Sequence, residues 1–137
     1  MLRLNVNAVI ENNIGEILFV RLRKGKFTGF ISIPGGGIKE GETSNEAIIR
    51  EIKEETGIIM DDINLIPIGY CELINNKKND HRVVLLYRGK AEGTPKNSIE
   101  TDSFWMKPEK IKEAMLPFAK KAIVNFKQEY INFQLIV

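Results

Sequence analysis

The chain has 137 residues, with 43% hydrophobic and 28% charged side chains, and carries a net charge of +2 from 20 basic and 18 acidic residues. At roughly 100 to 200 residues per domain, this length predicts a single domain over residues 1–137. The composition excludes collagen-like, disordered and disulfide-framework proteins, and the near-balanced charge excludes the overall positive field of a sequence-specific nucleic-acid binder.

The cysteine content and the apolar runs predict the cellular compartment of the protein. Cys71 is the one cysteine, so no internal disulfide forms, and we expect a small buried side chain in a reducing compartment. The amino terminus lacks the continuous apolar core of a signal peptide. The longest apolar run, Val83–Tyr87, has five residues, against the roughly 20 that a membrane helix needs. We therefore expect a cytoplasmic protein without a membrane span.

The first third of the chain is predicted to begin a β-sheet. Apolar residues recur with period two over residues 2–10, which places one face of a strand on a core. A turn at 12–15 and an apolar strand over 16–23 predict a hairpin. The basic segment 24–29 is predicted to be a mobile loop, and the short apolar segment 30–33 follows it.

A proline and three glycines occupy residues 34–37. Proline cannot donate to a β-ladder, and glycine adopts dihedral angles closed to other residues, so this tract is predicted to be a loop with unusual dihedrals. Glycines also allow another group to approach the backbone closely.

A helix is predicted over residues 44–56. Thr43 and Glu46 have the spacing of a capping box, and Gly57 fits the position just past a helix end.

The second half of the chain is predicted to complete the sheet. Strands over 63–73 and 81–90 flank an exposed polar tip at 75–80, and residues 104–106 predict the last short strand. Pro117 begins an amphipathic helix. Strands mixed with two helices predict a mixed α/β fold in which the helices cover a sheet.

Three glutamates share one side of the first predicted helix. At 100° per residue, Glu51, Glu54 and Glu55 lie within an arc of about 100° that borders the apolar stripe. Like charges at i and i+4, near the negative end of the helix dipole, destabilise an isolated helix. A divalent cation would remove both penalties, and clustered oxygen ligands suit Mg²⁺ or Mn²⁺. The alternative is a solvated acidic face neutralised by Arg50 and Lys53.

The glycine tract next to this helix favours a polyphosphate site, because its backbone amides and carbonyls would adjoin a carboxylate-bound Mg²⁺. The combined pattern is Gly36, five residues, Glu42, seven residues and then REIKEETGI over residues 50–58. This pattern matches the complete signature of the Nudix hydrolase family, and the chain resembles the family's MutT-like members. The resemblance implies an α/β/α sandwich with a mixed β-sheet.

The resemblance also implies a reaction and a ligand set. Family members hydrolyse a diphosphate that is linked to a group X. By analogy, Glu51 and Glu55 would be the principal ligands of Mg²⁺, or of Mn²⁺ as a substitute. Glu54 would be a further ligand or would accept a proton from the attacking water, and the carbonyl of Gly35 would be a backbone ligand.

Other motif positions have supporting roles by the same analogy. Gly36 and Gly57 belong to the signature itself, Arg50 would orient the glutamates through ion pairs, and Glu42 would brace the loop against the helix. Members often add an acidic residue from a late loop, and Glu100 resembles that residue.

Two details of the resemblance stay open. Asp102 and Glu92 compete with Glu100 for the role of the late acidic residue. Ile31 stands where many members carry tryptophan, so the subfamily is not assigned.

The substrate is less clearly encoded than the reaction. Arg21 and Arg23 share a strand face and would contact phosphate, or they form a solvated basic edge. Trp105 or Phe30 could stack on a base, although core packing explains such residues equally simply. His81 fits an edge residue better than a catalytic one.

The leading prediction is a MutT-like nucleoside triphosphate pyrophosphohydrolase whose partner is a nucleotide or a nucleoside diphosphate derivative. The alternatives are an ADP-ribose, nucleotide-sugar or dinucleoside-polyphosphate pyrophosphatase, and a noncatalytic nucleotide-sensing module. A homodimer is allowed but not required. Residues 39–57 carry a net charge of −3 and the remainder +5, which suits an acidic cation site in a body that attracts a polyphosphate.

Overall fold

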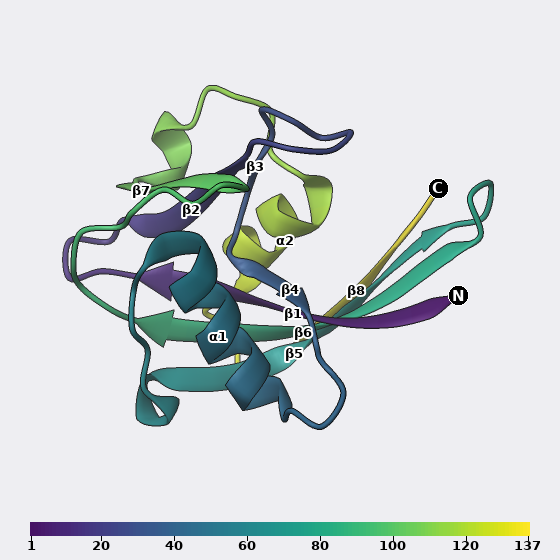
Figure 1. The fold of residues 1–137 in the computed structure, drawn as a ribbon, viewed down its shortest axis with the longest axis horizontal. Coiled ribbons are helices and arrows are strands. Elements are labelled where there is room, and N and C mark those ends of the chain that lie inside the picture. The colour runs from purple at the N-terminus through teal and green to yellow at the C-terminus, as the bar shows by residue number, and fades with distance from the viewer.

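The computed structural model describes residues 1–137, which form one eight-stranded sheet with a helix on each face (Figure 1). The strands are β1 Leu2–Glu11, β2 Ile17–Leu22, β3 Ile31–Ser32, β4 Gly35–Gly37, β5 Leu65–Asn75, β6 Asp80–Lys90, β7 Thr101–Met106 and β8 Ile131–Ile136. The helices are α1 Ser44–Thr56 and α2 Pro117–Asn125, and short 3₁₀ turns lie at Asp62–Asn64 and Pro108–Lys110. Neither α1 nor α2 is long and apolar enough to span a bilayer.

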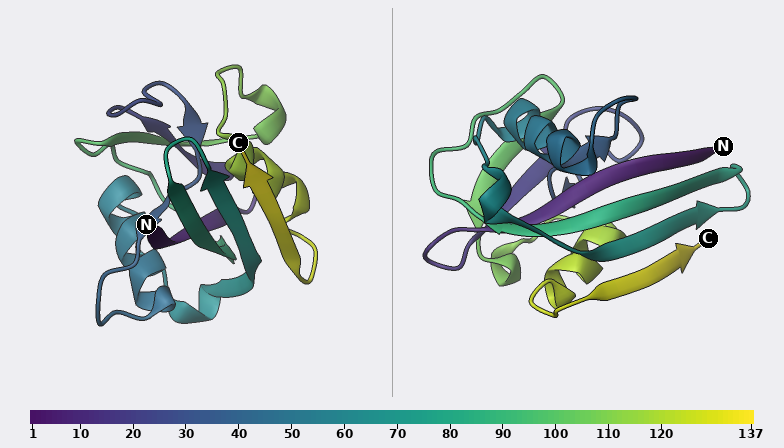
Figure 2. Two further views of the ribbon diagram at one scale, coloured as in Figure 1. Left: turned by 90° about the vertical axis from the view of Figure 1, so that its right-hand side faces the viewer. Right: turned by 90° about the horizontal axis from the view of Figure 1, so that it is seen from below.

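The sheet is mixed, as the sequence predicts. Its order is β3-β2-β1-β6-β5-β8, and β4 and β7 pair laterally with β1 and β2. The β1–β6 and β5–β8 pairs are parallel, and the other pairs are antiparallel. The right-hand view of Figure 2 shows α1 and α2 on opposite sides of this sheet, which confirms the α/β/α layering.

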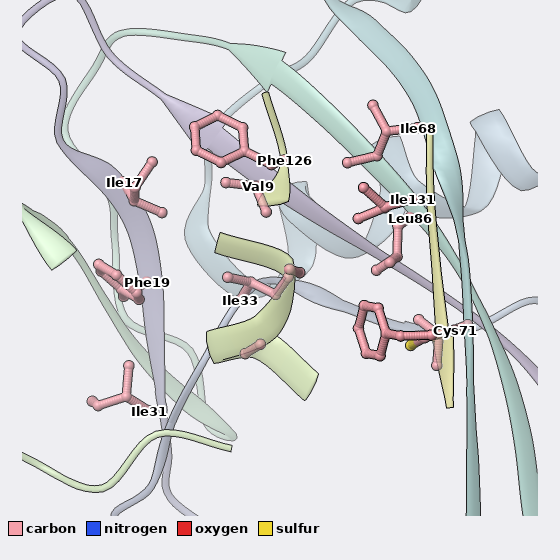
Figure 3. Packing of buried hydrophobic residues seen from close by; sticks show 14 residues of the cluster. Val9, Ile17, Phe19, Ile31, Ile33, Ile68, Cys71, Leu86, Phe126 and Ile131 are labelled. Carbon is pink, nitrogen blue, oxygen red and sulfur yellow. The ribbon is translucent and has the colours of Figure 1, made fainter. Parts of the chain in front are cut away.

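Each face of the sheet has its own core. On the α1 face, Val6, Ala8 and Ile10 of β1 pack with buried residues of the helix. On the α2 face, Val9 packs with a second cluster, which Figure 3 shows around Ile33 and Phe126. Strand β1 is therefore buried on both faces at its carboxyl end, whereas one buried face is what the period-two pattern predicts. Nearer the amino end, Leu2 and Leu4 are exposed.

Cys71 lies fully buried in the cluster on the α2 face. Burial raises the pKa of its thiol to about 12, so the side chain is an unreactive thiol at neutral pH. The prediction of a small buried side chain is confirmed.

The predicted hairpin of the first two strands forms only at its turn. Strands β1 and β2 share a single register pair, Glu11 with Ile17. Apart from that pair, β1 forms its ladders with β4 and β6, and β2 forms its ladders with β3 and β7. The turn residues predict the reversal of the chain, but they carry no information about which strands become neighbours.

The glycine tract is a strand, so the prediction of a loop is wrong. Gly35, Gly36 and Gly37 pair with residues 5–7 of β1. Pro34 does not interrupt the ladder, because its carbonyl accepts from the N–H of Ala8 at 3.0 Å and the missing proline N–H is not needed there.

The prediction that residues 104–106 form the last strand is also wrong. Strand β7 already begins at Thr101, and β8 follows α2 and pairs with β5. Ile131, Phe133 and Leu135 alternate with polar residues in β8 and face the core. This period-two signal is present in the sequence, although it is only six residues long.

Candidate active site

Helix α1 is held at both ends, which fixes the direction of its glutamates. Thr43 Oγ1 accepts from the N–H of Glu46 at 3.1 Å, and Glu46 Oε1 accepts from the N–H of Thr43 at 2.9 Å. Gly57 ends the helix with φ 75°, and its N–H donates to the carbonyl of Lys53. The predicted capping box and glycine cap are confirmed.

Gly35 and Gly36 of β4 are required by close approach and not by unusual dihedrals, whereas a Cβ on Gly37 would meet nothing within 4 Å. None of the three has a positive φ. A Cβ on Gly36 would lie 2.6 Å from the carboxyl carbon of Glu51, and a Cβ on Gly35 would lie 2.0 Å from the carbonyl oxygen of Val6. Any side chain at these positions would therefore displace α1 from β4 or β4 from β1.

The outer edge of β4 faces α1. In an antiparallel ladder, residues alternate between bonding the neighbouring strand and pointing away from it. Pro34 and Ile38 bond β1, so Gly35 and Gly37 direct their backbone groups away from it. The N–H of Gly35 donates to Glu55 Oε1 at 2.7 Å, and the carbonyl of Gly37 accepts from Arg50 at 3.0 Å. The Gly35 carbonyl is thereby directed to the same side as Glu55.

Arg50 joins the loop, the helix and the glycine strand. Its guanidinium donates to Glu42 through Nε at 2.9 Å and through Nη2 at 2.6 Å. It also donates to Glu51 at 2.8 Å and more weakly to Glu54 at 3.4 Å. The Arg50 guanidinium and the Lys39 N–H lower the pKa of Glu42 to about 2, and these carboxylates raise the pKa of Arg50.

Glu55 has no such cationic partner. Burial raises its pKa to about 8, against the lowering effect of its hydrogen bond from Gly35, and the charges of Glu51, Glu100 and Glu54 raise it further. Burial also raises the pKa of Glu51, although Arg50 opposes the effect. The carboxylates of Glu51 and Glu55 are thus both held in environments that disfavour their charged forms.

The donor set fits a hard divalent cation. Glu51 and Glu55 are partly buried and have raised pKa values, and Glu54 is 54% exposed. A divalent cation would compensate these charges, and carboxylate and carbonyl oxygens are the ligands that Mg²⁺ prefers. No group of three or more His, Cys, Asp or Glu side chains stands at metal-ligand spacing, so the carboxylates would have to converge on binding.

Of the three late acidic residues, Glu100 is the one whose charge acts on Glu55. It is exposed and adjoins Thr101, whose hydroxyl donates to the Glu55 carbonyl at 3.1 Å. Asp102 instead lies within 4 Å of Arg21 and Arg23, and Glu92 accepts from the N–H of Asn13. The structure therefore places Glu100 beside the site and its two competitors elsewhere.

A cavity of about 190 Å³ begins at Glu55 and Gly35 and extends over the α2 face of the sheet. Its apolar lining includes Leu22, Leu73, Val84 and Phe118, and its polar lining includes Asn5, Asn7 and Arg82. Asn7 is buried and donates to the carbonyl of Ile33 at 3.0 Å. An apolar pocket with a few polar groups next to a carboxylate site is typical of a small-ligand site.

Arg21 and Arg23 do not line this cavity. Their neighbours Val20 and Leu22 do, so the two arginines point to the opposite face of β2. Arg21 pairs with Glu113 and stacks on Phe104, and Arg23 donates to the carbonyl of Ser98. The structure brings them to acidic and carbonyl groups of the chain itself.

The aromatic residues and His81 also have partners within the chain. The indole of Trp105 donates to the carbonyl of Gly93 at 2.7 Å and packs against the core on the α1 face. Phe30 makes an edge contact with Phe27, and His81 lies 2.9 Å from Glu72. Neither aromatic residue lines the cavity.

Sequence reasoning missed Arg82, Asn5 and Phe118 in the cavity wall. Arg82 lies two residues before Val84 on the same face of β6, which also carries Leu86. A charged residue next to apolar residues at period two was the sequence signal that could have placed Arg82 in the cavity wall. Phe118 lies in the first turn of α2 and shows no signal beyond a core residue.

Comparison with known proteins identifies the family. The family model described as the NUDIX domain matches residues 1–126. An ADP-ribose pyrophosphatase of Methanocaldococcus jannaschii is 44% identical over 54 residues, which are 39% of this chain and 31% of the relative. An RNA pyrophosphohydrolase of Vibrio atlanticus is 41% identical over 64 residues, which are 47% of this chain and 36% of the relative. The matched region thus spans about a third of the length of each curated relative.

The likeness to solved structures covers nearly the whole fold. A MutT NUDIX hydrolase from Burkholderia pseudomallei superimposes with a TM-score of 0.80 over 90% of this chain and 97% of its own, at 22% identity. At that identity the likeness supports the fold alone, while the family model covers most of the sequence. The chain belongs to the Nudix hydrolase family.

Proposed function

We propose that this chain is a divalent-metal-dependent pyrophosphohydrolase that acts on a nucleotide derivative. The observation that carries the proposal is Glu55, which lines the cavity and whose carboxylate accepts a hydrogen bond from the glycine strand without a cation beside it. Glu51 lies against Gly36 of the same strand. Carboxylates in this position serve phosphate chemistry, because they can hold the cation that a diphosphate requires.

Glu51, Glu54 and Glu55 would hold Mg²⁺ together with the Gly35 carbonyl, and Mn²⁺ would substitute for it. When bound, the ion would supply charge neutralisation on the diphosphate and would acidify a water molecule. Glu100 is the additional carboxylate that we assign to the same site, because its charge already acts on Glu55.

The residues of the chain perform the remaining steps. Arg50 holds Glu51 in place by the hydrogen bond at 2.8 Å, and Glu42 fixes Arg50 in turn. Glu54, the most exposed of the three glutamates, accepts the proton of the attacking water. The water oxygen forms a bond to phosphorus, the bond from phosphorus to the bridging oxygen breaks, and the leaving phosphate retains that electron pair.

The preferred substrate in this proposal is a nucleoside triphosphate, as in MutT-like enzymes. The apolar wall of the cavity would pack against the nucleoside, with the diphosphate directed to Glu55. ADP-ribose is the second candidate. It is favoured by the match to an ADP-ribose pyrophosphatase that is 44% identical over 54 residues.

A substrate panel tests the proposal. The purified chain is assayed with Mg²⁺, with Mn²⁺ and with a chelator against nucleoside triphosphates, ADP-ribose, nucleotide sugars, dinucleoside polyphosphates and a 5′-triphosphorylated oligoribonucleotide. We expect metal-dependent cleavage of the diphosphate linkage into two phosphorylated products, such as a monophosphate and pyrophosphate from a triphosphate or AMP and ribose 5-phosphate from ADP-ribose. We also expect a loss of about 10² to 10⁴-fold in Glu54→Gln.

The control variant is Glu40→Gln, which changes an exposed carboxylate in the loop before α1. Equal losses in both variants would contradict the assigned site. If no member of the panel is hydrolysed but nucleotides bind, the chain is a nucleotide-sensing module and not an enzyme.

A further inference from the structure

Two arginines lie opposite each other on neighbouring strands at the far end of the cavity. Arg3 of β1 and Arg82 of β6 are register partners in the parallel pair. Like charges directly opposite each other destabilise a sheet. This pair is therefore a local cost in the β1–β6 ladder, where the next partners on the same face are Asn5 with Val84 and Asn7 with Leu86.

The arginine pair borders the candidate active site. Arg82 lines the cavity that contains Glu55, and it also lines an adjoining groove of about 500 Å³ together with Arg3. Asn5 and Gly36 line both spaces as well. The two spaces therefore adjoin each other along Asn5, Gly36 and Arg82.

The positive charge of the pair is only partly neutralised. Asp80 is its acidic contact, at 2.6 Å from Arg3 and 3.7 Å from Arg82. Lys78 lies two residues before Asp80, and its ammonium group lowers the pKa of Lys26 from the loop after β2. Two guanidinium groups thus share one carboxylate, and Lys78 lines a surface hollow with Arg3 and Asp80, which leaves a surplus of positive charge beside the groove.

The spacing along β1 sets the distance between the strand position that bonds Glu55 and the arginine pair. Gly35, which bonds Glu55, lies opposite Asn7. Arg3 is four residues earlier on β1, so it lies about 13 Å from that point along the strand. Val84, the register partner of Asn5, lies between these two points on the apolar wall of the cavity, and Leu73 lies level with Arg82.

We propose that Arg3 and Arg82 bind a second phosphate, attached to the ribose on the side away from the diphosphate that is cleaved. The inference rests on the proposed function for the placement of that diphosphate at Glu55. Guanidinium groups suit this role because their planar donors bind phosphate oxygens in pairs. The ligand class is a nucleotide with a 3′-phosphate, either as a terminal phosphomonoester or as the first phosphodiester of an oligonucleotide.

Equilibrium binding tests this inference without requiring turnover. Adenosine 5′-monophosphate, adenosine 3′,5′-bisphosphate and the dinucleotide pApA are titrated calorimetrically into the full chain with Mg²⁺, and the guanosine series is measured in parallel. We expect at least one of the two ligands with a 3′-phosphate to bind about tenfold more tightly than the monophosphate. A preference for the bisphosphate indicates a terminal phosphate, and a preference for pApA indicates a nucleic-acid chain.

Three variants and one control sharpen the measurement. Arg3→Gln and Arg82→Gln should each remove most of the advantage of the 3′-phosphate, while Asp80→Asn should increase it because the competing carboxylate is lost. The control is Arg88→Gln, since Arg88 lies on the same strand but lines a different cavity. It should keep the full advantage.

The proposal is overturned if the wild-type chain binds all three ligands equally, or if Arg88→Gln loses as much as Arg82→Gln. Failure of all three ligands to bind would overturn this inference, whereas the proposed function is judged separately by hydrolysis in the substrate panel. A preference for the 3′-phosphate in a chain that hydrolyses nothing would contradict the proposed function and leave the arginine site standing.

Discussion

The fold surrounds the glutamates at the two ends of the candidate site differently. Glu42 and Glu51 share the guanidinium of Arg50, and the pKa of Glu42 falls to about 2. One turn further along, Glu55 receives a single backbone N–H, and its pKa rises to about 8. Both regions are partly buried and acidic, so the opposite pKa shifts follow from Arg50, which lies beside Glu42 but not beside Glu55.

This difference separates a structural role from a chemical one. Charges that the fold itself neutralises hold the loop, helix and glycine strand together. A carboxylate that the fold brings out of water without a cation costs stability and persists where function needs it. The comparison therefore supports the proposal that Arg50 and Glu42 brace the site and that Glu55 binds the cation.

The largest expected effect comes from changing Glu55, the carboxylate without a cation beside it. Glu55→Gln should lower metal-dependent hydrolysis by about 10³-fold, because it removes a charged oxygen ligand while keeping the shape of the side chain. The metal-free fold should remain intact, as circular dichroism and thermal melting can show. Activity near that of the wild type would place the cation elsewhere.

The pH dependence of stability is the next largest effect. The folded pKa of Glu55 is about 8, above its ordinary value of 4.5, so the folded metal-free chain binds more protons than the unfolded chain between these values. The free energy of unfolding should therefore be highest below about pH 4.5 with respect to this group and should fall as the pH rises to about 8, by at most roughly 5 kcal/mol.

Urea unfolding at several pH values measures this dependence. Glu55→Gln should flatten most of the decline, and a smaller slope should remain because the pKa of Glu51 is also raised. Saturating Mg²⁺ should remove the decline in the wild type, because the ion stabilises the charged form. A metal-free chain that gains stability with pH over this range would contradict the comparison.

Removing Arg50, the cation shared by Glu42 and Glu51, should lower the stability of the fold as well as the activity. Arg50→Gln leaves Glu42 and Glu51 without their cation and should lower the free energy of unfolding by roughly 2 to 4 kcal/mol at neutral pH. Arg50→Lys should recover only part of this loss, because one ammonium cannot replace a guanidinium that contacts both carboxylates and the Gly37 carbonyl. Full stability in Arg50→Gln would show that the network does not brace the site.

The sequence predicts α1 and its glutamates well because each signal is local. Capping residues, the apolar stripe and the glutamate arc all follow from helical spacing, and the structure forms the predicted helix over Ser44–Thr56. The family signature then supplies a prediction of the reaction class.

What the sequence could not predict depends on contacts between distant segments. Gly35–Gly37 become a strand only because β1 offers an edge 28 or more residues earlier in the chain. Arg21 and Arg23 turn to Asp102 and Glu113 because β7 and the segment after it pack beside β2. Arg82 reaches the cavity through the register of β6 with β1. Each of these positions is set by strand pairing, which local patterns do not encode.

The smallest predicted effect concerns how α1 is anchored. Thr43→Ala removes the hydroxyl that accepts from the N–H of Glu46 at 3.1 Å and should cost about 1 kcal/mol of stability. Because the apolar residues Ala47, Ile48 and Ile52 still fix the helix on the sheet, the glutamates at its carboxyl end should keep their positions. Hydrolysis per folded molecule and Mg²⁺ affinity should then change by less than about twofold. Thr43→Ser, which retains the hydroxyl, is the matched control for the stability loss. If Thr43→Ala instead lowered Mg²⁺ affinity by about tenfold, the position of Glu55 would depend on the whole helix and not on its contacts with the glycine strand.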